Sequence, residues 1–321
     1  MNNSHMKDTH LTETEITALE NLAGKKISTW RDLSRQGGYT TAVRKVVAFE
    51  DGSTYFAKIA REEHVAGWMA IEALVYRQVE PLDLPYIADF VGYADLGPSA
   101  ACLLLQDLSG LHWQYDWTWK RQKSILKMLD RVAALLKEER CDWSWVGHLS
   151  DLHNELCNWQ DIIDSPEGFL GLGLCSYDWW KKNRDGLLKA EGEAVLSGDD
   201  LLHFDVRSDN ICFDDDDRPI IVDWNWILKG NGRMDELAWL PSLIMEGGTL
   251  DCFLPLSAAD GHLLAMLAGF WAACAPLPDI HPSSTLRSLQ LNCLKVSLSV
   301  ACGLLGLEHP DLYDCRGDLA I

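Results

Sequence analysis

Two short apolar runs around a polar turn limit how this chain can fold more than any other feature of its sequence. Residues 211–213 and 220–222 are apolar and flank four consecutive aspartates at positions 214–217. Apolar, β-branched runs on either side of a polar turn are typical of a β-hairpin. Such a hairpin places Asn210, at its beginning, beside Asp223, at its end.

The residues around this hairpin are suited to bind a divalent cation and to take up a proton. An amide oxygen from Asn210 and a carboxylate from Asp223 form an all-oxygen site of the kind that Mg²⁺ prefers. Asp205 stands five residues before Asn210, so we expect its carboxylate to lie close enough to accept a proton from a substrate hydroxyl. A hard cation together with a base predicts phosphoryl transfer.

A small sheet with one principal helix is predicted for the first part of the chain. Asp51-Gly52 lies between two β-branched and aromatic runs, which is a strong hairpin signal. Thr12 and Glu15 have the spacing of a capping box at the start of a helix. The predicted elements are helices over residues 11–24 and 64–79 and strands over 41–49, 54–60, 88–93 and 100–105.

Helical signals dominate after residue 111, for example over residues 124–137 and 263–275. We therefore expect an α+β chain with two lobes. Residues 1–108 form an N-terminal lobe with an antiparallel sheet of about five strands and one long helix. Residues 109–321 form a mostly helical C-terminal lobe.

Composition argues against several classes of partner. The net charge of −20 lies mostly in residues 111–321, and nucleic acids and anionic membranes are bound through Lys and Arg, so we expect neither as a partner. No apolar run reaches the roughly 18 residues of a membrane span. The ten cysteines form no CxxC pair and no secretory signal opens the chain, which predicts free thiols and a cytoplasmic protein.

The polar motif around the hairpin resembles the catalytic signature of the aminoglycoside phosphotransferase and choline kinase-like family, whose fold is protein kinase-like. The matching residues are His203, Asp205 and Asn210, followed after the hairpin by Asp223-Trp224. The resemblance implies that Asp205 is the catalytic base. It implies that Asn210 and Asp223 are metal ligands.

The resemblance extends to the first lobe. Lys58, at the end of Tyr-Phe-Ala-Lys, is similar to the family's phosphate-binding lysine, and Glu72 is similar to the helix glutamate that holds this lysine by an ion pair. Residues 103–108 are similar to the strand that runs into the adenine-binding hinge. The resemblance therefore implies that Gln106 and Leu108 contribute to nucleotide binding.

The chain also departs from the family pattern. Residues 34–41 contain only two adjacent glycines and no GxGxxG motif, and Phe204 stands where the family commonly has glycine. Arg207 occupies a variable position, where a phosphate contact is one option. The resemblance implies structural roles for His203, which orients the loop, and for Asp235, which caps a helix and braces the site.

Together these features predict an ATP-dependent small-molecule kinase that uses Mg²⁺, with GTP as the alternative donor. The acidic second lobe favours a cationic acceptor, such as an aminoglycoside or another amino sugar. Choline-like alcohols, neutral sugars and macrolides stay open as acceptors. A non-catalytic nucleotide-binding protein and a Mg²⁺-dependent hydrolase are the alternative functions, and the oligomeric state is open.

Overall fold

The computed structural model describes residues 10–33, 41–253, 255–279 and 285–312. The chain divides into two compact units, each built from two segments. The first unit comprises Met1–Trp113 and Asp209–Trp226, and the second comprises Gln114–Ser208 and Ile227–Ile321. The boundary expected after residue 108 lies shortly before Trp113, where the first segment of the first unit ends. The first unit also includes a segment from later in the chain.

That later segment is the hairpin around the aspartate-rich turn. Its strands are β7 (Ile211–Phe213) and β8 (Pro219–Ile221), which pair antiparallel. The backbone N–H of Ile221 donates to the carbonyl of Tyr86 at 3.0 Å, and Phe213 and His112 exchange two backbone hydrogen bonds. These bonds to residues before Trp113 explain why the hairpin belongs to the first unit.

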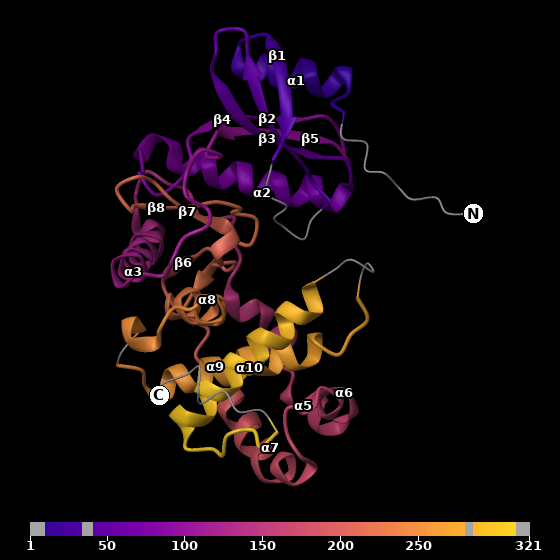
Figure 1. Cartoon of the computed structure of the whole chain (residues 1–321), viewed down its shortest axis with the longest axis vertical. Coiled ribbons are helices and arrows are strands. Elements are labelled where there is room, and N and C mark those ends of the chain that lie inside the picture. The colour runs from indigo at the N-terminus through magenta and orange to yellow at the C-terminus, as the bar shows by residue number, and fades with distance from the viewer. Residues whose placement is uncertain (1–9, 34–40, 254, 280–284, 313–321) are drawn as a thin grey trace, which may run out of the picture. The chain divides into compact units, whose positions relative to one another are not determined.

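The main sheet of the first unit is antiparallel and has five strands in the order β1-β2-β3-β5-β4 (Figure 1). The strands are β1 (Ile27–Asp32), β2 (Val43–Phe49), β3 (Thr54–Ala60), β4 (Phe90–Asp95) and β5 (Ala101–Gln106). The predicted five-stranded antiparallel sheet is therefore confirmed.

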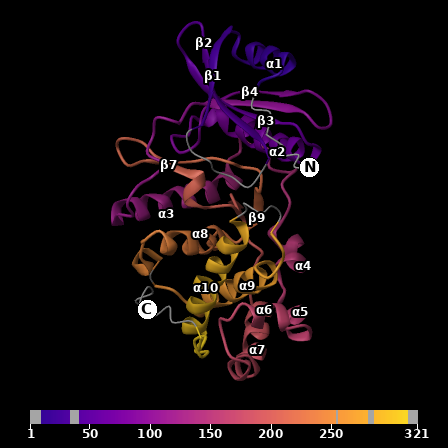
Figure 2. The same cartoon turned by 45° about the vertical axis from the view of Figure 1, so that its right-hand side comes forward.

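Two helices cover opposite faces of this sheet, as Figures 1 and 2 show. Successive side chains of a strand point to opposite faces. Val47 and Ile59 belong to an apolar cluster that α1 (Glu13–Ala23) helps to build. Lys58 therefore lies on the other face, against which α2 (Glu63–Val79) packs.

Local chemistry explains where the first elements begin and turn. The N–H of Glu15 donates to the hydroxyl of Thr12 at 3.3 Å, and the N–H of Thr12 donates to the Glu15 carboxylate at 2.8 Å. This reciprocal capping box satisfies N–H groups that the first helical turn leaves unpaired. Gly52, in the turn between β2 and β3, has φ 86°, a conformation that glycine adopts without steric cost.

The second unit is mostly helical, as predicted for the later part of the chain. Its helices are α3 (Trp119–Ala134), α4 (His153–Leu156), α5 (Trp159–Asp164), α6 (Glu167–Gly171), α7 (Tyr177–Gly192), α8 (Arg233–Met245), α9 (Ala258–Cys274) and α10 (Leu286–Leu305). A two-stranded sheet pairs β6 (Asp200–Leu202) with β9 (Leu228–Gly230). The core of the unit lies where α9 packs along α10.

The structure bears on two expectations from composition. Among the residues described, α10 alone is long and apolar enough to cross a membrane by length and composition. One such helix is weak evidence for a membrane span, because a core helix passes the same test, and α10 packs along α9. The nine cysteines within the described ranges are free thiols.

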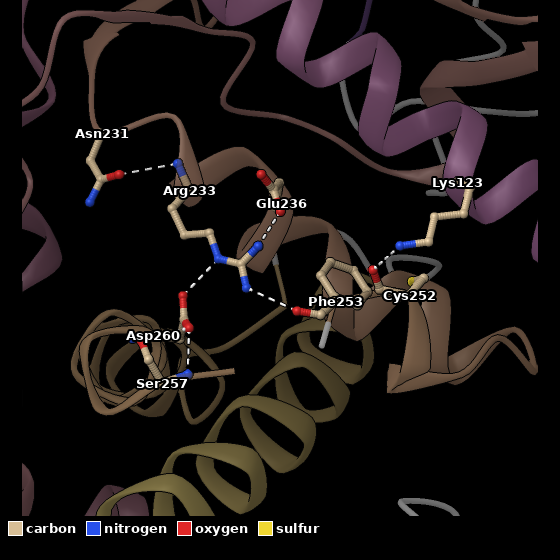
Figure 3. A network of polar contacts seen from close by, with 8 residues as sticks. All are labelled: Lys123, Asn231, Arg233, Glu236, Cys252, Phe253, Ser257 and Asp260. Atoms are coloured by element: carbon tan, nitrogen blue, oxygen red, sulfur yellow. Dashed lines mark hydrogen bonds and ion pairs between the residues drawn. The ribbon is translucent and has the colours of Figure 1, made fainter. Parts of the chain in front are cut away.

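A polar network fastens the beginning of α8 to its neighbours in the second unit (Figure 3). Arg233 donates through Nε to Asp260 of α9 at 2.7 Å and through Nη2 to the carbonyl of Phe253 at 3.4 Å. Its remaining nitrogen, Nη1, forms an ion pair with Glu236 one turn along α8. The network fixes the first turn of α8, which carries Asp235.

Candidate active site

A buried lysine with two carboxylate partners lies in the first unit. Lys58 Nζ, from β3, is 2.7 Å from Oε2 of Glu72 on α2 and 2.6 Å from Oδ1 of Asp223, just after β8. The side chains of Lys58 and Glu72 are 5% and 2% exposed. The ion pair that the resemblance implies is present, and it extends to the carboxylate at the end of the hairpin.

The two carboxylates keep the lysine charged. Burial alone would lower the pKa of Lys58, but the negative charges of Glu72 and Asp223 outweigh burial and raise it. Burial raises the pKa of Glu72, and the nearby charge of Asp223 adds to this effect while Lys58 opposes it. The site therefore holds a fixed ammonium group, which is suited to contact a phosphate oxygen.

The hairpin brings Asn210 beside Val222, the residue before Asp223. Ile211 pairs with Ile221, and the N–H of Val222 donates to the carbonyl of Asn210 at 2.9 Å. Asp223 has φ 71°, in the left-handed region that aspartate enters more readily than most residues.

The donor set at the ends of the hairpin fits Mg²⁺. Mg²⁺ favours oxygen ligands and commonly binds through one or two protein side chains, substrate phosphates and water. Asn210 and Asp223 supply an amide and a carboxylate oxygen. Within the described ranges no group of three or more His, Cys, Asp or Glu side chains could hold a metal ion. An Mg²⁺ ion held by two protein side chains commonly takes its other ligands from substrate phosphates and water.

The loop that carries Asp205 lies in the second unit and is held by Asp235. The backbone N–H groups of His203 and Phe204 donate to the two carboxylate oxygens of Asp235 at 2.7 and 2.8 Å. The N–H of Asp205 donates to Nδ1 of His203 at 3.2 Å. Burial raises the pKa of Asp235 to about 7, and the two backbone hydrogen bonds oppose this rise. His203 and Asp235 contact the loop backbone, as their implied roles in orienting the loop and bracing the site require. The implied helix cap is wrong, because Asp235 lies inside α8, whose N-cap residue is Gly232, and its carboxylate binds the loop instead.

Arg207 fixes the Asp205 carboxylate. Its Nε lies 3.0 Å from Oδ1, and its Nη2 lies 3.3 Å from Oδ2. Both side chains are partly exposed, at 20% for Arg207 and 25% for Asp205. The ion pair therefore orients a carboxylate that solvent can reach.

Phe204 adopts a backbone conformation that is unusual for a residue with a Cβ atom. Its φ of 59° lies in the left-handed region, which costs most residues about 1–2 kcal/mol but costs glycine nothing. We expect Phe204→Gly to be more stable than Phe204→Ala by about 1 kcal/mol in urea unfolding. Both variants lose the same ring contacts, so their difference reports on the backbone. Greater stability of the alanine variant would contradict the prediction.

The two predicted hinge residues already use several of their polar groups. The N–H of Gln106 donates to the carbonyl of Asp89 at 2.9 Å, and the Gln106 side chain accepts from the Asp89 N–H at 3.2 Å. The carbonyl of Leu108 accepts from the N–H of Leu111 and from the indole of Trp113. These bonds involve neither the backbone carbonyl nor the side-chain NH2 group of Gln106, and they do not involve the N–H of Leu108.

The structure thus places the predicted residues in both units. Those in the first unit are Lys58, Glu72, Gln106, Leu108, Asn210 and Asp223, and the one in the second unit is Asp205. Lys58, Glu72 and Asp223 are in direct contact. Residues 34–40 of the predicted two-glycine segment lie outside the described residues.

The sequence does not predict a second polar cluster beside the Asp205 loop. The Ser208 hydroxyl donates to Oε2 of Glu246, and Nε1 of Trp117 donates to the same oxygen at 3.1 Å. The Trp117 ring also contacts that of Trp239. These residues are far apart in the sequence, so no local pattern could join them.

Comparison with known proteins identifies the fold. No protein-family model and no curated protein sequence matches the chain. An aminoglycoside phosphotransferase from Alicyclobacillus acidocaldarius aligns with 92% of this chain and 95% of its own, with a TM-score of 0.58 and 14% identity. The chain has the fold of this phosphotransferase.

Two further structures agree with this assignment. An aminoglycoside 2'-phosphotransferase in complex with GDP aligns with 89% of this chain and 94% of its own, with a TM-score of 0.58 and 10% identity. A macrolide 2'-phosphotransferase from Brachybacterium faecium aligns with 86% of this chain and 96% of its own, with a TM-score of 0.54 and 14% identity. The predicted kinase-like fold, with its N-terminal antiparallel sheet and helical C-terminal part, is confirmed.

Proposed function

We propose that the chain is an ATP-dependent phosphotransferase that phosphorylates a hydroxyl group of a small molecule. The observation that carries the proposal is the ion cluster in which the buried Lys58 contacts the buried Glu72 and the half-buried Asp223. A charged lysine is costly to bury, and its place on a sheet of this fold suits the binding of nucleotide phosphates. The GDP complex of one structural neighbour supports a nucleotide donor, with GTP as the alternative to ATP.

Each site residue has a role in the proposed reaction. Lys58 binds nucleotide phosphates, and Gln106 and Leu108 contact the base. Asn210 and Asp223 hold Mg²⁺, which neutralises charge on the phosphates when bound. The acceptor oxygen forms a bond to the γ-phosphorus as the bond to the β–γ bridging oxygen breaks. Asp205 accepts the hydroxyl proton, and the nucleoside diphosphate leaves.

We further propose that the acceptor carries a positive charge, as an aminoglycoside or another amino sugar does. Glu246 is exposed, and its carboxylate is fixed by the Ser208 hydroxyl and the Trp117 indole. Ser208 follows Asp205 by three residues, so this carboxylate lies beside the catalytic loop. A fixed carboxylate next to an aromatic ring is suited to bind an ammonium group. Choline-like alcohols, neutral sugars and macrolides are the competing acceptors.

The test is a screen of acceptors that measures the release of nucleoside diphosphate with ATP or GTP and Mg²⁺. The panel contains aminoglycosides, amino sugars, choline, neutral sugars and macrolides. We expect turnover with a cationic acceptor, and a higher KM for that acceptor in the Glu246→Gln variant. Turnover restricted to neutral acceptors would overturn the acceptor class. Nucleotide binding without turnover across the panel would overturn the proposed activity.

A further inference from the structure

Arg44 lies directly across from Lys58 in the sheet of the first unit. The register of β2 and β3 pairs these two residues. Directly opposite residues of an antiparallel pair lie on the same face, with Cβ atoms about 4.5–5.5 Å apart. Arg44 therefore shares the face of the sheet that carries Lys58 and meets α2. Its side chain is half-buried, and one nitrogen donates to the carbonyl of Ala42 at 3.3 Å.

The charge of Arg44 acts on the same ion cluster. The pKa of Lys58 is raised overall, but burial opposes this rise most strongly, and the charge of Arg44 opposes it as well. Burial raises the pKa of Glu72, whereas Arg44 helps to lower it. Two cations, Arg44 and Lys58, thus share this face with two carboxylates, Glu72 and Asp223.

The sequence lacks the backbone device that commonly covers nucleotide phosphates. A glycine-rich loop contacts phosphates through its N–H groups, and residues 34–41 contain no GxGxxG motif. A triphosphate brings more negative charge than one Mg²⁺ neutralises, so further donors are favourable. A guanidinium group supplies them in a planar fork that matches phosphate oxygens.

We propose that Arg44 binds the nucleotide phosphates together with Lys58, so that a side chain of β2 supplies donors that a glycine-rich loop would otherwise provide. This inference rests on the proposed function. Arg44 is the cross-strand neighbour of the one lysine that the site already assigns to phosphate. Its role is therefore specific to the phosphate part of the nucleotide and independent of the base.

The chain offers a matched control on the same strand. Lys45 is adjacent to Arg44 but points to the opposite face, where its side chain is 2% exposed and pairs with Asp32 at 2.5 Å. Lys45→Met removes one positive charge from β2, as Arg44→Met does. The two variants differ in the face of the sheet from which the charge is lost.

The experiment measures the affinities of ATP, ADP and adenosine by calorimetry, with and without Mg²⁺. The proteins are the wild type, Arg44→Met, Arg44→Lys and Lys45→Met, each checked for its melting temperature. We expect Arg44→Met to weaken the affinity for ATP and ADP by about 10- to 100-fold, the loss expected for a charge-assisted hydrogen bond. The affinity for adenosine should stay unchanged. Arg44→Lys should retain part of the affinity. Lys45→Met should leave the ratio of ATP to adenosine affinity unchanged.

Two results would overturn the role of Arg44 in phosphate binding but leave the proposed function intact. One is unchanged ATP affinity in Arg44→Met, and the other is an equal loss of ATP and adenosine affinity, which indicates a structural effect. If Arg44→Met does not fold, the ratio of ATP to adenosine affinity in Arg44→Lys decides whether Arg44 binds the phosphates. A wild-type protein that binds adenosine and ATP equally also contradicts the inference. A wild-type protein that binds no nucleotide at all would instead overturn the proposed function and the inference with it.

Discussion

The Asp205→Asn variant is expected to lose phosphoryl transfer by about 10²- to 10⁴-fold in kcat, the usual contribution of a positioned general base. Its nucleotide affinity is expected to equal that of the wild type, because the nucleotide-binding groups are assigned to other residues. Asparagine keeps the size of the side chain but cannot accept the hydroxyl proton. Turnover is measured by nucleoside diphosphate release with the best acceptor, and affinity by calorimetry.

Asp216→Asn is the control for this experiment. Asp216 is 74% exposed in the aspartate-rich turn and forms an ion pair with Arg218. The variant loses the same charge from the chain, so its kcat should match the wild type. A normal kcat in Asp205→Asn would exclude the role as a base. A parallel fall in nucleotide affinity would show that Asp205 acts on the nucleotide instead.

The second large effect concerns stability. Lys58→Met is expected to lower the free energy of unfolding by about 3–5 kcal/mol, because the buried Glu72 and the half-buried Asp223 lose the cation that contacts both of them. The loss should shrink as the pH falls. Burial already raises the pKa of Glu72, and the variant also lacks the Lys58 charge that lowers it. The folded variant therefore takes up a proton before its unfolded state and before the folded wild type do, and protonation removes the uncompensated charge. Urea unfolding at several pH values measures both effects.

Lys45→Met separates this mechanism from the loss of any buried lysine. Lys45 is as buried as Lys58, but its partner Asp32 is 67% exposed and stays hydrated when the lysine is removed. We therefore expect a smaller loss of stability than in Lys58→Met. The double variant Lys58→Met with Glu72→Leu should recover part of the loss. Equal losses in the two single variants would contradict the explanation.

The sequence predicts the parts of the fold that depend on local patterns. The Asp51-Gly52 turn and the runs beside it predict β2 and β3. A two-residue turn at Asp51-Gly52 would pair Arg44 with Ile59, but the observed turn also includes Glu50, and this shifts the register by one residue and places Arg44 opposite Lys58. The register therefore needed the structure, whereas the hairpin from 211 to 221 already predicts that Asn210 and Asp223 lie near each other.

Other features leave no local signal. The strands β6 and β9 have three residues each, which is too short for a recognisable alternation. β1 is an edge strand whose side chains are exposed or half-buried, so it lacks the apolar pattern of a buried strand. In α10, polar residues such as Gln290 and Ser297 are buried, which obscures its apolar face. The N–H of Phe204 donates to Asp235, a partner 31 residues along the chain that no local pattern reveals.

The hairpin segment Asp209–Trp226 gives the chain an order of assembly during its synthesis. The first unit begins near the N-terminus but is completed only when this segment has left the ribosome. Until then Lys58 has Glu72 but not Asp223, and the backbone near Tyr86 lacks its partner at Ile221. A nascent chain that stops at Trp113 therefore lacks two contacts of the finished unit, the Asp223 carboxylate at Lys58 and the Ile221 N–H at the Tyr86 carbonyl.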